Sequence, residues 1–200
     1  MAHESFLALF TFAFVSSVTP GPNNLMLMAS GANFGFKRTL PHMFGVGFGF
    51  CFMIIVIGIG IIRLFEIFPA VYDVLKVVSI IYMLWLAWKI ANAGAPQPAA
   101  PEDKTVSHKP FTFLQAGLFQ WVNPKGWTMA LTAVTVYAPH HDLKTILSIS
   151  ALFGLINIAV ISAWVLLGTS MRQWLSNQKR LRIFNWTMAA LLVGSLALML

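Results

Sequence analysis

The chain has 200 residues, of which 58% are hydrophobic and only 10% are charged. A soluble globular domain carries about 25% charged residues, so this composition excludes ordinary folding in water. The net charge of +7 comes from basic residues placed between apolar runs. That pattern indicates membrane topology and contact with anionic lipid rather than binding of nucleic acid.

The apolar runs are long enough to cross a bilayer as helices, which needs about 20 residues each. They are apolar on all sides, whereas transmembrane strands alternate apolar and polar residues. The sequence therefore predicts an all-α polytopic membrane protein with six transmembrane helices. We expect the spans at residues 5–34, 41–62, 69–91, 111–136, 145–168 and 183–200.

One long polar segment, residues 92–110, separates the first three spans from the last three. Its alanines, prolines and charged residues cannot build a hydrophobic core, so we expect an exposed linker between two units, residues 1–91 and 111–200. Most basic residues fall in the links after the first, third and fifth spans: Lys37, Arg38, Lys89, Lys104, Lys109, Arg172, Lys179, Arg180 and Arg182. The positive-inside rule then places these links and the linker in the cytoplasm and both termini in the periplasm.

Prolines interrupt two of the predicted spans near their middles. The first span contains Thr-Pro-Gly-Pro-Asn-Asn at residues 19–24, and the fourth contains Trp-Val-Asn-Pro-Lys-Gly at residues 121–126. Proline cannot donate a backbone hydrogen bond and clashes with the carbonyl one turn back. We therefore expect unpaired carbonyls at Ser16, Val18 and Gln120, at mid-membrane depth.

Each predicted three-span unit begins with a proline-broken span. Because three is an odd number, two successive units must cross the membrane in opposite orientations. This is the inverted-repeat arrangement of many secondary transporters. We therefore expect the fold to consist of two inverted three-helix repeats that bring the two breaks together.

The chemistry of the two breaks suits a small zwitterion. The half-helices that begin after the prolines present partial positive charge, to which Lys125 adds a full one, and this favours a carboxylate. The half-helices that end before the prolines present carbonyls that accept from an ammonium group. An α-amino acid has both groups. The candidate substrate-binding residues are Thr19, Pro20, Gly21, Pro22, Asn23, Asn24, Gln120, Asn123, Pro124 and Lys125.

Simpler interpretations of these residues remain open at this point. A single proline break is most often only a kink, Lys125 could extend to the interface, and Asn23 and Asn24 could cap the helix after the break. Two further polar residues in the spans, His42 and Asn157, are candidates for the pathway or for proton transfer.

Enzymatic signatures are missing from the sequence. No set of nucleophile, base and orienting group is visible, and the adjacent spacing of His140, His141 and Asp142 does not suit a metal. We therefore expect no enzyme, no catalytic residues, no metal site and no cofactor.

Several segments resemble the lysine exporter (LysE/RhtB) superfamily. The segment Thr-Pro-Gly-Pro-Asn-Asn at 19–24, Ser-Gly-Ala at 30–32 and Gly-Phe-Lys-Arg-Thr at 35–39 are similar to the family's first helix and the basic turn after it. Phe-Gln-Trp-Val-Asn-Pro-Lys at 119–125 resembles its second-half Asn-Pro-Lys motif, and residues 82–89 resemble the end of its third helix. The resemblance implies proton-driven export of amino acids or close derivatives from the bacterial cytoplasm. It carries over to Pro20, Gly21, Pro22, Asn23, Asn24, Asn123, Pro124 and Lys125.

The sequence thus predicts a secondary-active amino-acid exporter of the bacterial inner membrane. Its partners would be the substrate and the lipid bilayer, and the glycine-rich second span would suit association into a homodimer. Alternatives are a transporter or channel for another small solute, or a non-catalytic membrane assembly factor.

Overall fold

The computed structural model describes residues 3–61, 69–93 and 109–197, and within these ranges the chain is helical with no strand. The helices are α1 (His3–Val18), α2 (Pro22–Phe34), α3 (Phe36–Val56) with a π-helical end η1 (Ile57–Ile61), α5 (Pro69–Ala91), α6 (Phe113–Phe119), the 3₁₀ turn η2 (Gln120–Val122), α7 (Pro124–Tyr137), α8 (Leu143–Ser170), the 3₁₀ turn η3 (Trp174–Ser176) and α9 (Gln178–Ala197). The prediction of an all-α polytopic membrane protein is confirmed. Most of the linker predicted at residues 92–110 lies outside the described residues.

Three described helices are long and apolar enough to cross a bilayer by themselves: Phe36–Gly60, Asp73–Ala91 and Leu143–Ser170. The pair Ser5–Val18 and Pro22–Phe34 passes the same test jointly, with a bend of 52° between its two parts. Large apolar side chains such as Phe48, Leu155 and Trp88 are exposed on the outer surface. A surface of this kind faces lipid. Six spans stay a prediction.

A single glycine joins α2 to α3. Gly35 has φ +80°, a conformation that side-chain-bearing residues rarely adopt, and it both ends α2 and starts α3. The second span therefore begins at Phe36 rather than at residue 41, and Pro41 lies inside it. The backbone freedom of Gly35 removes the need for the longer turn expected from the sequence.

Side-chain caps extend the last two helices beyond the predicted bounds. The Asp142 carboxylate accepts from the Thr145 N–H (2.9 Å), which starts α8 at Leu143 and lowers the pKa of Asp142. The Asn177 side chain accepts from the Lys179 N–H (2.9 Å), so α9 begins at Gln178 and not at residue 183. Basic residues thus occupy the first turn of α9, because an N-cap stabilises a helix start regardless of apolar periodicity.

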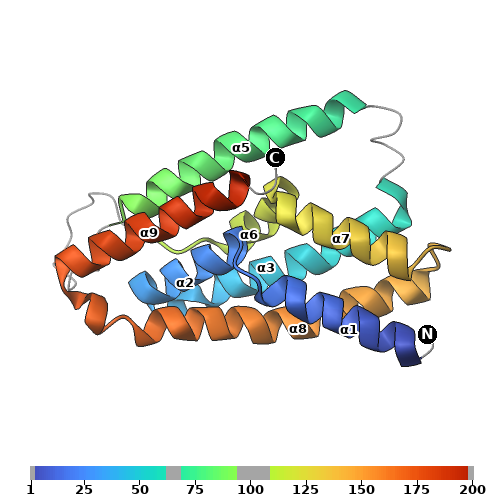
Figure 1. The fold of residues 1–200 in the computed structure, drawn as a ribbon, viewed down its shortest axis with the longest axis horizontal. Coiled ribbons are helices and arrows are strands. Elements are labelled where there is room, and N and C mark those ends of the chain that lie inside the picture. Colours follow the sequence, from blue (N-terminus) through green and yellow to red (C-terminus); the bar gives the residue numbers. More distant parts are fainter. Residues whose placement is uncertain (1–2, 62–68, 94–108, 198–200) are drawn as a thin grey trace.

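Helices of the two halves of the chain pack against each other rather than forming separate bundles. The parts of the first predicted span, α1 and α2, pack on α8; those of the fourth, α6 and α7, pack on α3; and α5 packs along α9 (Figure 1). Each buried apolar cluster draws residues from both halves, for example Leu25, Leu86, Phe119 and Phe184 in one of them.

Glycines allow close contacts between helices. A Cβ at Gly168 on α8 would overlap the Met28 carbonyl oxygen of α2, and a Cβ at Gly49 on α3 would stand 2.6 Å from the Cα of Gly117 on α6. Small residues allow such backbone approach in membranes. These contacts fix the positions of α2, which follows the first break, and of α6, which precedes the second.

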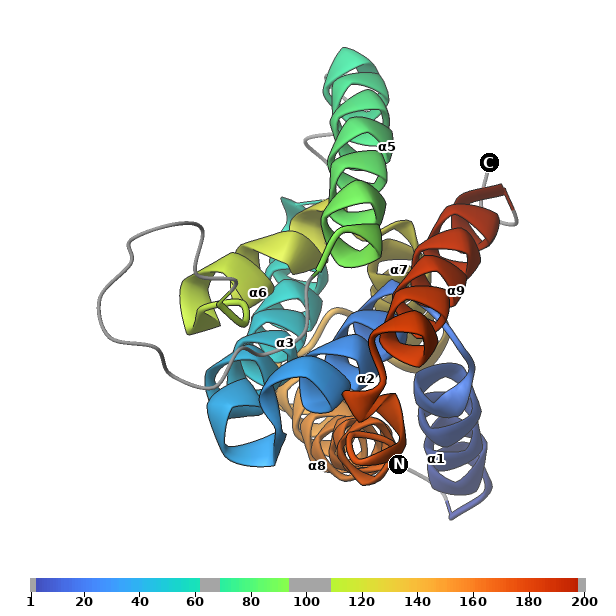
Figure 2. The ribbon, with the colours of Figure 1, turned by 90° about the vertical axis from the view of Figure 1, so that its left-hand side faces the viewer.

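Basic residues gather at one end of the molecule. The α2–α3 junction, the end of α5, the end of α8 and the start of α9 lie together there, at the left of Figure 1 and facing the viewer in Figure 2. A Cβ on Gly35 would be 3.3 Å from the guanidinium of Arg172, and the Asn185 amide donates to the Ala93 carbonyl (2.8 Å). At the opposite end, His141 Nδ1 lies 3.0 Å from the Gly58 carbonyl oxygen.

Candidate functional site

The first helix interruption has an extended backbone. α1 ends at Val18, and Gly21 adopts φ −168° and ψ 175° before α2 begins at Pro22. Proline suits the first helical position because its missing N–H would have no helical partner there. Any residue can adopt the Gly21 backbone. The reason for glycine is space: an added Cβ would stand 2.7 Å from Cδ of Lys125.

The second interruption has the same order of elements. α6 passes into the 3₁₀ turn η2, Asn123 is extended with φ −99° and ψ 104°, and α7 begins at Pro124. A residue before proline is disfavoured in the helical region, which explains why the helix stops at Asn123. The Gln120 carbonyl, expected to be unpaired, accepts from the Asn123 N–H at 3.3 Å.

Direct hydrogen bonds join the two interruptions, about 100 residues apart in sequence. Lys125 Nζ donates to the carbonyl oxygen (2.7 Å) and the hydroxyl (2.8 Å) of Thr19. The side-chain amides of Asn23 and Gln120 pair reciprocally, at 2.8 and 3.2 Å. The ammonium of Lys125 therefore rests on the carboxyl end of the first half-helix.

Polar side chains satisfy most of the remaining carbonyls of the first break. Asn24 Nδ2 donates to the carbonyls of Ser17 (2.7 Å) and Thr19 (3.0 Å). The Thr19 hydroxyl donates to the Ser16 carbonyl at 2.9 Å, so Ser16 is not the free acceptor expected from the sequence. The carbonyls of Ser16, Ser17 and Thr19 are thus all paired with side chains.

A cavity of about 30 Å³ lies between the two breaks, with room for about one or two water molecules. Two buried atoms at this cavity, Ser17 Oγ and Asn123 Oδ1, have no hydrogen-bond partner among the described residues. Buried polar groups are nearly always paired, so these two atoms are available to a ligand or to water. The lining residues are Ser16, Ser17, Gly21, Asn23, Asn24, Phe50, Asn123, Lys125, Gly126, Met129 and Asn157.

The family model described as LysE type translocator matches residues 14–200 of the chain. The chain belongs to the LysE type translocator family. It is 30% identical over 163 residues to a cysteine/O-acetylserine efflux protein of Salmonella paratyphi A and 26% identical over 163 residues to that of Escherichia coli K12, covering 80% of each chain in both cases. No solved structure matches the chain.

Of the residues that sequence reasoning singled out, this LysE type translocator brings seven to the cavity wall: Ser16, Gly21, Asn23, Asn24, Asn123, Lys125 and Asn157. Thr19 and Gln120 lie directly behind them through their bonds to Lys125 and Asn23. The three prolines, Pro20, Pro22 and Pro124, shape the backbone and do not line the cavity.

Four lining residues were not predicted: Ser17, Phe50, Gly126 and Met129. Ser17 could have been predicted from the sequence, because it is a second hydroxyl residue, beside Ser16, just before the break in an apolar span. Phe50 and Met129 are ordinary apolar residues in sequence, and only the packing of α3 and α7 brings them to the cavity.

His42 does not reach the cavity between the breaks. It lies near the start of α3, is 2% exposed, and lines a second cavity of about 80 Å³ at the basic end of the molecule. Its ring centroid is 5.2 Å from that of Phe111. His42 and Asn157, both candidates for the pathway, thus belong to different cavities.

Proposed function

We propose that this LysE type translocator is a secondary-active exporter of amino acids or close derivatives in the bacterial inner membrane. The substrate would bind between the α1–α2 break and the α6–α7 break. The observation that carries the proposal is the pair of bonds from Lys125 Nζ to Thr19 across the two breaks. Support for the substrate class comes from the relatives, which are named for efflux of cysteine and O-acetylserine.

The cross-break bonds suggest how a substrate would engage. A carboxylate would compete with Thr19 for the Lys125 ammonium, because a cation is attracted more strongly to an ionised oxygen than to a neutral one. The carbonyls of Ser17 and Thr19, now held by Asn24, would accept from an ammonium group. The unpartnered Ser17 Oγ and Asn123 Oδ1 would complete the site.

Substrate binding would therefore replace the bonds that hold the two breaks together. The present cavity of about 30 Å³ is too small for an amino acid, so binding requires the breaks to separate. Alternating access requires bonds that hold one state of the protein and that the substrate can replace when it binds. Two inverted units, residues 1–91 and 111–200, would move relative to each other. In each unit the broken pair of helices packs on the second helix of the other unit: α1–α2 pack on α8, and α6–α7 pack on α3. This reciprocal packing is compatible with such a repeat.

A charge-removal variant tests the proposal. Cells that express the chain should export labelled cysteine or O-acetylserine faster than cells without it, and Lys125→Met should reduce export by at least about tenfold. Lys144→Met, at an exposed position outside the cavity, is the matched control and should export normally. The amount of protein in the membrane fraction must be equal for all three. Normal export by Lys125→Met would disprove the proposed site.

A passive channel is the competing function within the transport class. A carrier moves its substrate against a gradient and saturates, and the small volume of the cavity between the breaks, about 30 Å³, favours this behaviour over a continuous pore. Efflux that continues against a tenfold external excess of the amino acid, and stops when the proton gradient is collapsed, would distinguish the exporter from the channel.

A further inference from the structure

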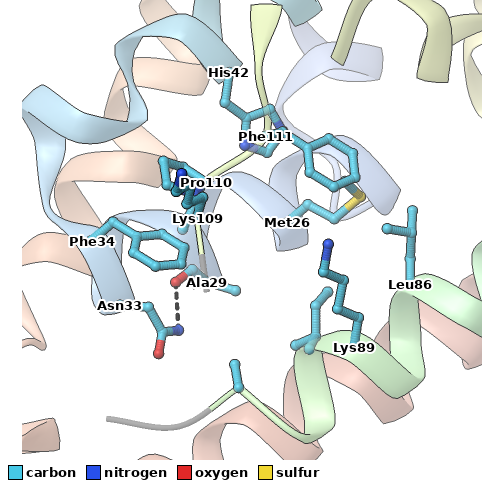
Figure 3. Close-up of a pocket in the computed structure, with 13 residues that line it drawn as sticks. Met26, Ala29, Asn33, Phe34, His42, Leu86, Lys89, Lys109, Pro110 and Phe111 are labelled. Atoms are coloured by element: carbon cyan, nitrogen blue, oxygen red, sulfur yellow. Dashed lines mark hydrogen bonds between the residues drawn. The ribbon is translucent and has the colours of Figure 1, made fainter. Parts of the chain in front are cut away.

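The second cavity lies at the basic end of the molecule, between α2, the start of α3, the end of α5 and residues 109–111 (Figure 3). Its volume is about 80 Å³, more than twice that of the cavity between the breaks. The apolar part of its wall includes Met26, Phe34, Leu86, Ile90 and Phe111. Binding sites for small molecules are typically lined in this way, by apolar side chains with a few polar groups that orient the ligand.

Three buried polar atoms at this cavity have no hydrogen-bond partner among the described residues. They are both ring nitrogens of His42, which is 2% exposed, and Oδ1 of Asn33, which is 4% exposed. The Asn33 amide nitrogen donates to the Ala29 carbonyl (2.8 Å) and to Asn185 Oδ1 (3.3 Å). These bonds fix the Asn33 side chain and leave its oxygen as an unused acceptor.

Two cations stand at the same cavity. Lys89 comes from α5 and Lys109 from the segment before α6, and none of the residues that line the cavity is acidic. In Figure 3 the Lys89 side chain extends from α5 toward Met26 and Phe111. The Lys89 ammonium lies 5.0 Å from the Trp85 ring centroid and has no ion-pair partner in the part of the chain that the structure describes.

A structural role does not explain His42. A buried ring that makes no hydrogen bond loses its bonds to water and gains only packing, here against Phe111. An apolar side chain of similar size would fill the space between α3 and Phe111 equally well. The two unused nitrogens are therefore available to a ligand that enters the cavity.

We propose that this cavity is a second binding site, where a small zwitterion of the amino-acid class is captured before it reaches the breaks. This inference rests on the proposed function. Lys89 and Lys109 attract the carboxylate, the Asn33 oxygen and one His42 nitrogen accept from the ammonium group, and the apolar wall contacts the substrate's side chain. In a neutral imidazole one nitrogen donates and the other accepts, so His42 can also donate to the carboxylate.

Helix α2 connects the two sites. Asn23 and Asn24, in its first turn, line the cavity between the breaks, and Ser30 and Asn33, near its end, line the second cavity. Ten residues of helix separate Asn23 from Asn33, about 15 Å along the axis. A solute held at the second site therefore lies one helix length from the proposed transport site, at the end where the positive charges predict the cytoplasm.

Equilibrium binding of reduced radiolabelled L-cysteine to the purified full-length protein tests the second site. We expect the wild type to bind two equivalents, His42→Leu one, Lys125→Met one, and the double variant none. Lys89→Met is an independent variant of the second site and should also bind one equivalent. His140→Leu, at an exposed position outside both cavities, is the matched control and should bind two.

Transport into inverted vesicles gives the second measurement. His42→Leu should raise the KM for cysteine by about fivefold or more, and raise it by a larger factor than it lowers the maximal rate, because it removes a binding step. Two equivalents bound by His42→Leu and by Lys89→Met, with unchanged KM, would overturn the second site and leave the proposed function standing. A wild type that neither binds nor exports cysteine would overturn both.

Discussion

At the scale of single residues, the side chain of Lys125 connects the two breaks. Lysine in a membrane span is costly and is usually paired or exposed to a water-filled space. Here its ammonium lies on the Thr19 carbonyl and hydroxyl, which belong to the other half of the chain. Its stem passes beside Gly21, where an added Cβ would stand 2.7 Å from Cδ and 3.0 Å from Nζ. Gly21 therefore controls where the charge can sit.

Replacing Gly21 with alanine should displace the Lys125 charge without destabilising the fold. The extended backbone at Gly21 accepts alanine, and the atoms in the way belong to the flexible end of Lys125. We expect Gly21→Ala to lower export by about tenfold or more, while the thermal midpoint of the detergent-solubilised protein changes by less than about 2 °C. A variant that unfolds early, or exports normally, would contradict this role of the glycine.

Sequence reasoning found the polar residues of this site except Ser17, but not their pairing. Proline chemistry and the Asn-Pro-Lys spacing point to both breaks, since these depend on local backbone rules. The pairing of Lys125 with Thr19 depends on how α1 and α7 approach each other, which no local rule encodes. The sequence also predicted free carbonyls at Ser16 and Gln120, but the Thr19 hydroxyl and the Asn123 N–H, each three residues further on, pair with them.

At the scale of elements, glycines set how closely α2 and α8 pack. Gly168 on α8 meets the Met28 carbonyl, and Gly31 on α2 meets the Val165 backbone. α2 carries residues of both cavities, so the position of α2 on α8 affects the walls of both. Helix packing through small residues thus connects the sequence of α8 with the geometry of the sites.

Gly168→Ala tests this packing. Its Cβ would overlap backbone atoms that cannot rotate away, so we expect a loss of stability of about 1–3 kcal/mol. Gly194→Ala is the control: nothing lies within 4 Å of its Cβ, and alanine at this exposed position of α9 should stabilise the helix by up to about 1 kcal/mol. Thermal unfolding in detergent measures both. Equal effects at the two positions would mean that α2 and α8 do not pack as described.

Element boundaries followed from the sequence only where composition changes sharply. α5 has the predicted bounds, Pro69–Ala91, because a proline starts it and polar residues follow its end. α3 and α9 begin five residues earlier than expected, at Phe36 and Gln178. Gly35 starts α3 through its backbone conformation, and Asn177 starts α9 by capping it. Neither effect can be read from the hydrophobicity of the sequence.

At the scale of the whole molecule, charge is distributed along the bundle. Lys89, Lys109, Arg172 and the basic first turn of α9 lie near one end, with the cavity of His42. The cavity between the breaks lies further along α2. If the basic end is cytoplasmic, the two cavities follow each other in the direction of export.

Reporter fusions test that orientation. A reporter that is active only in the periplasm should work at the C-terminus, and one that is active only in the cytoplasm should work after Ala93 and after Ser176, because basic links are retained inside. The reverse pattern at all three positions would place the second cavity on the periplasmic side and remove its role in capture from the cytoplasm.

The central claim is that an amino acid binds between the two breaks, and thiol protection at Ser17 tests it most directly. Ser17 lines that cavity with an unpartnered hydroxyl, so Ser17→Cys in a Cys51→Ser background changes little but adds a reactive group. Ser170→Cys, exposed near the end of α8, is the control. The account predicts that the exported amino acid slows alkylation of Ser17→Cys at concentrations near its KM and leaves Ser170→Cys unaffected. Alkylation of Ser17→Cys at the same rate with and without saturating substrate would contradict it.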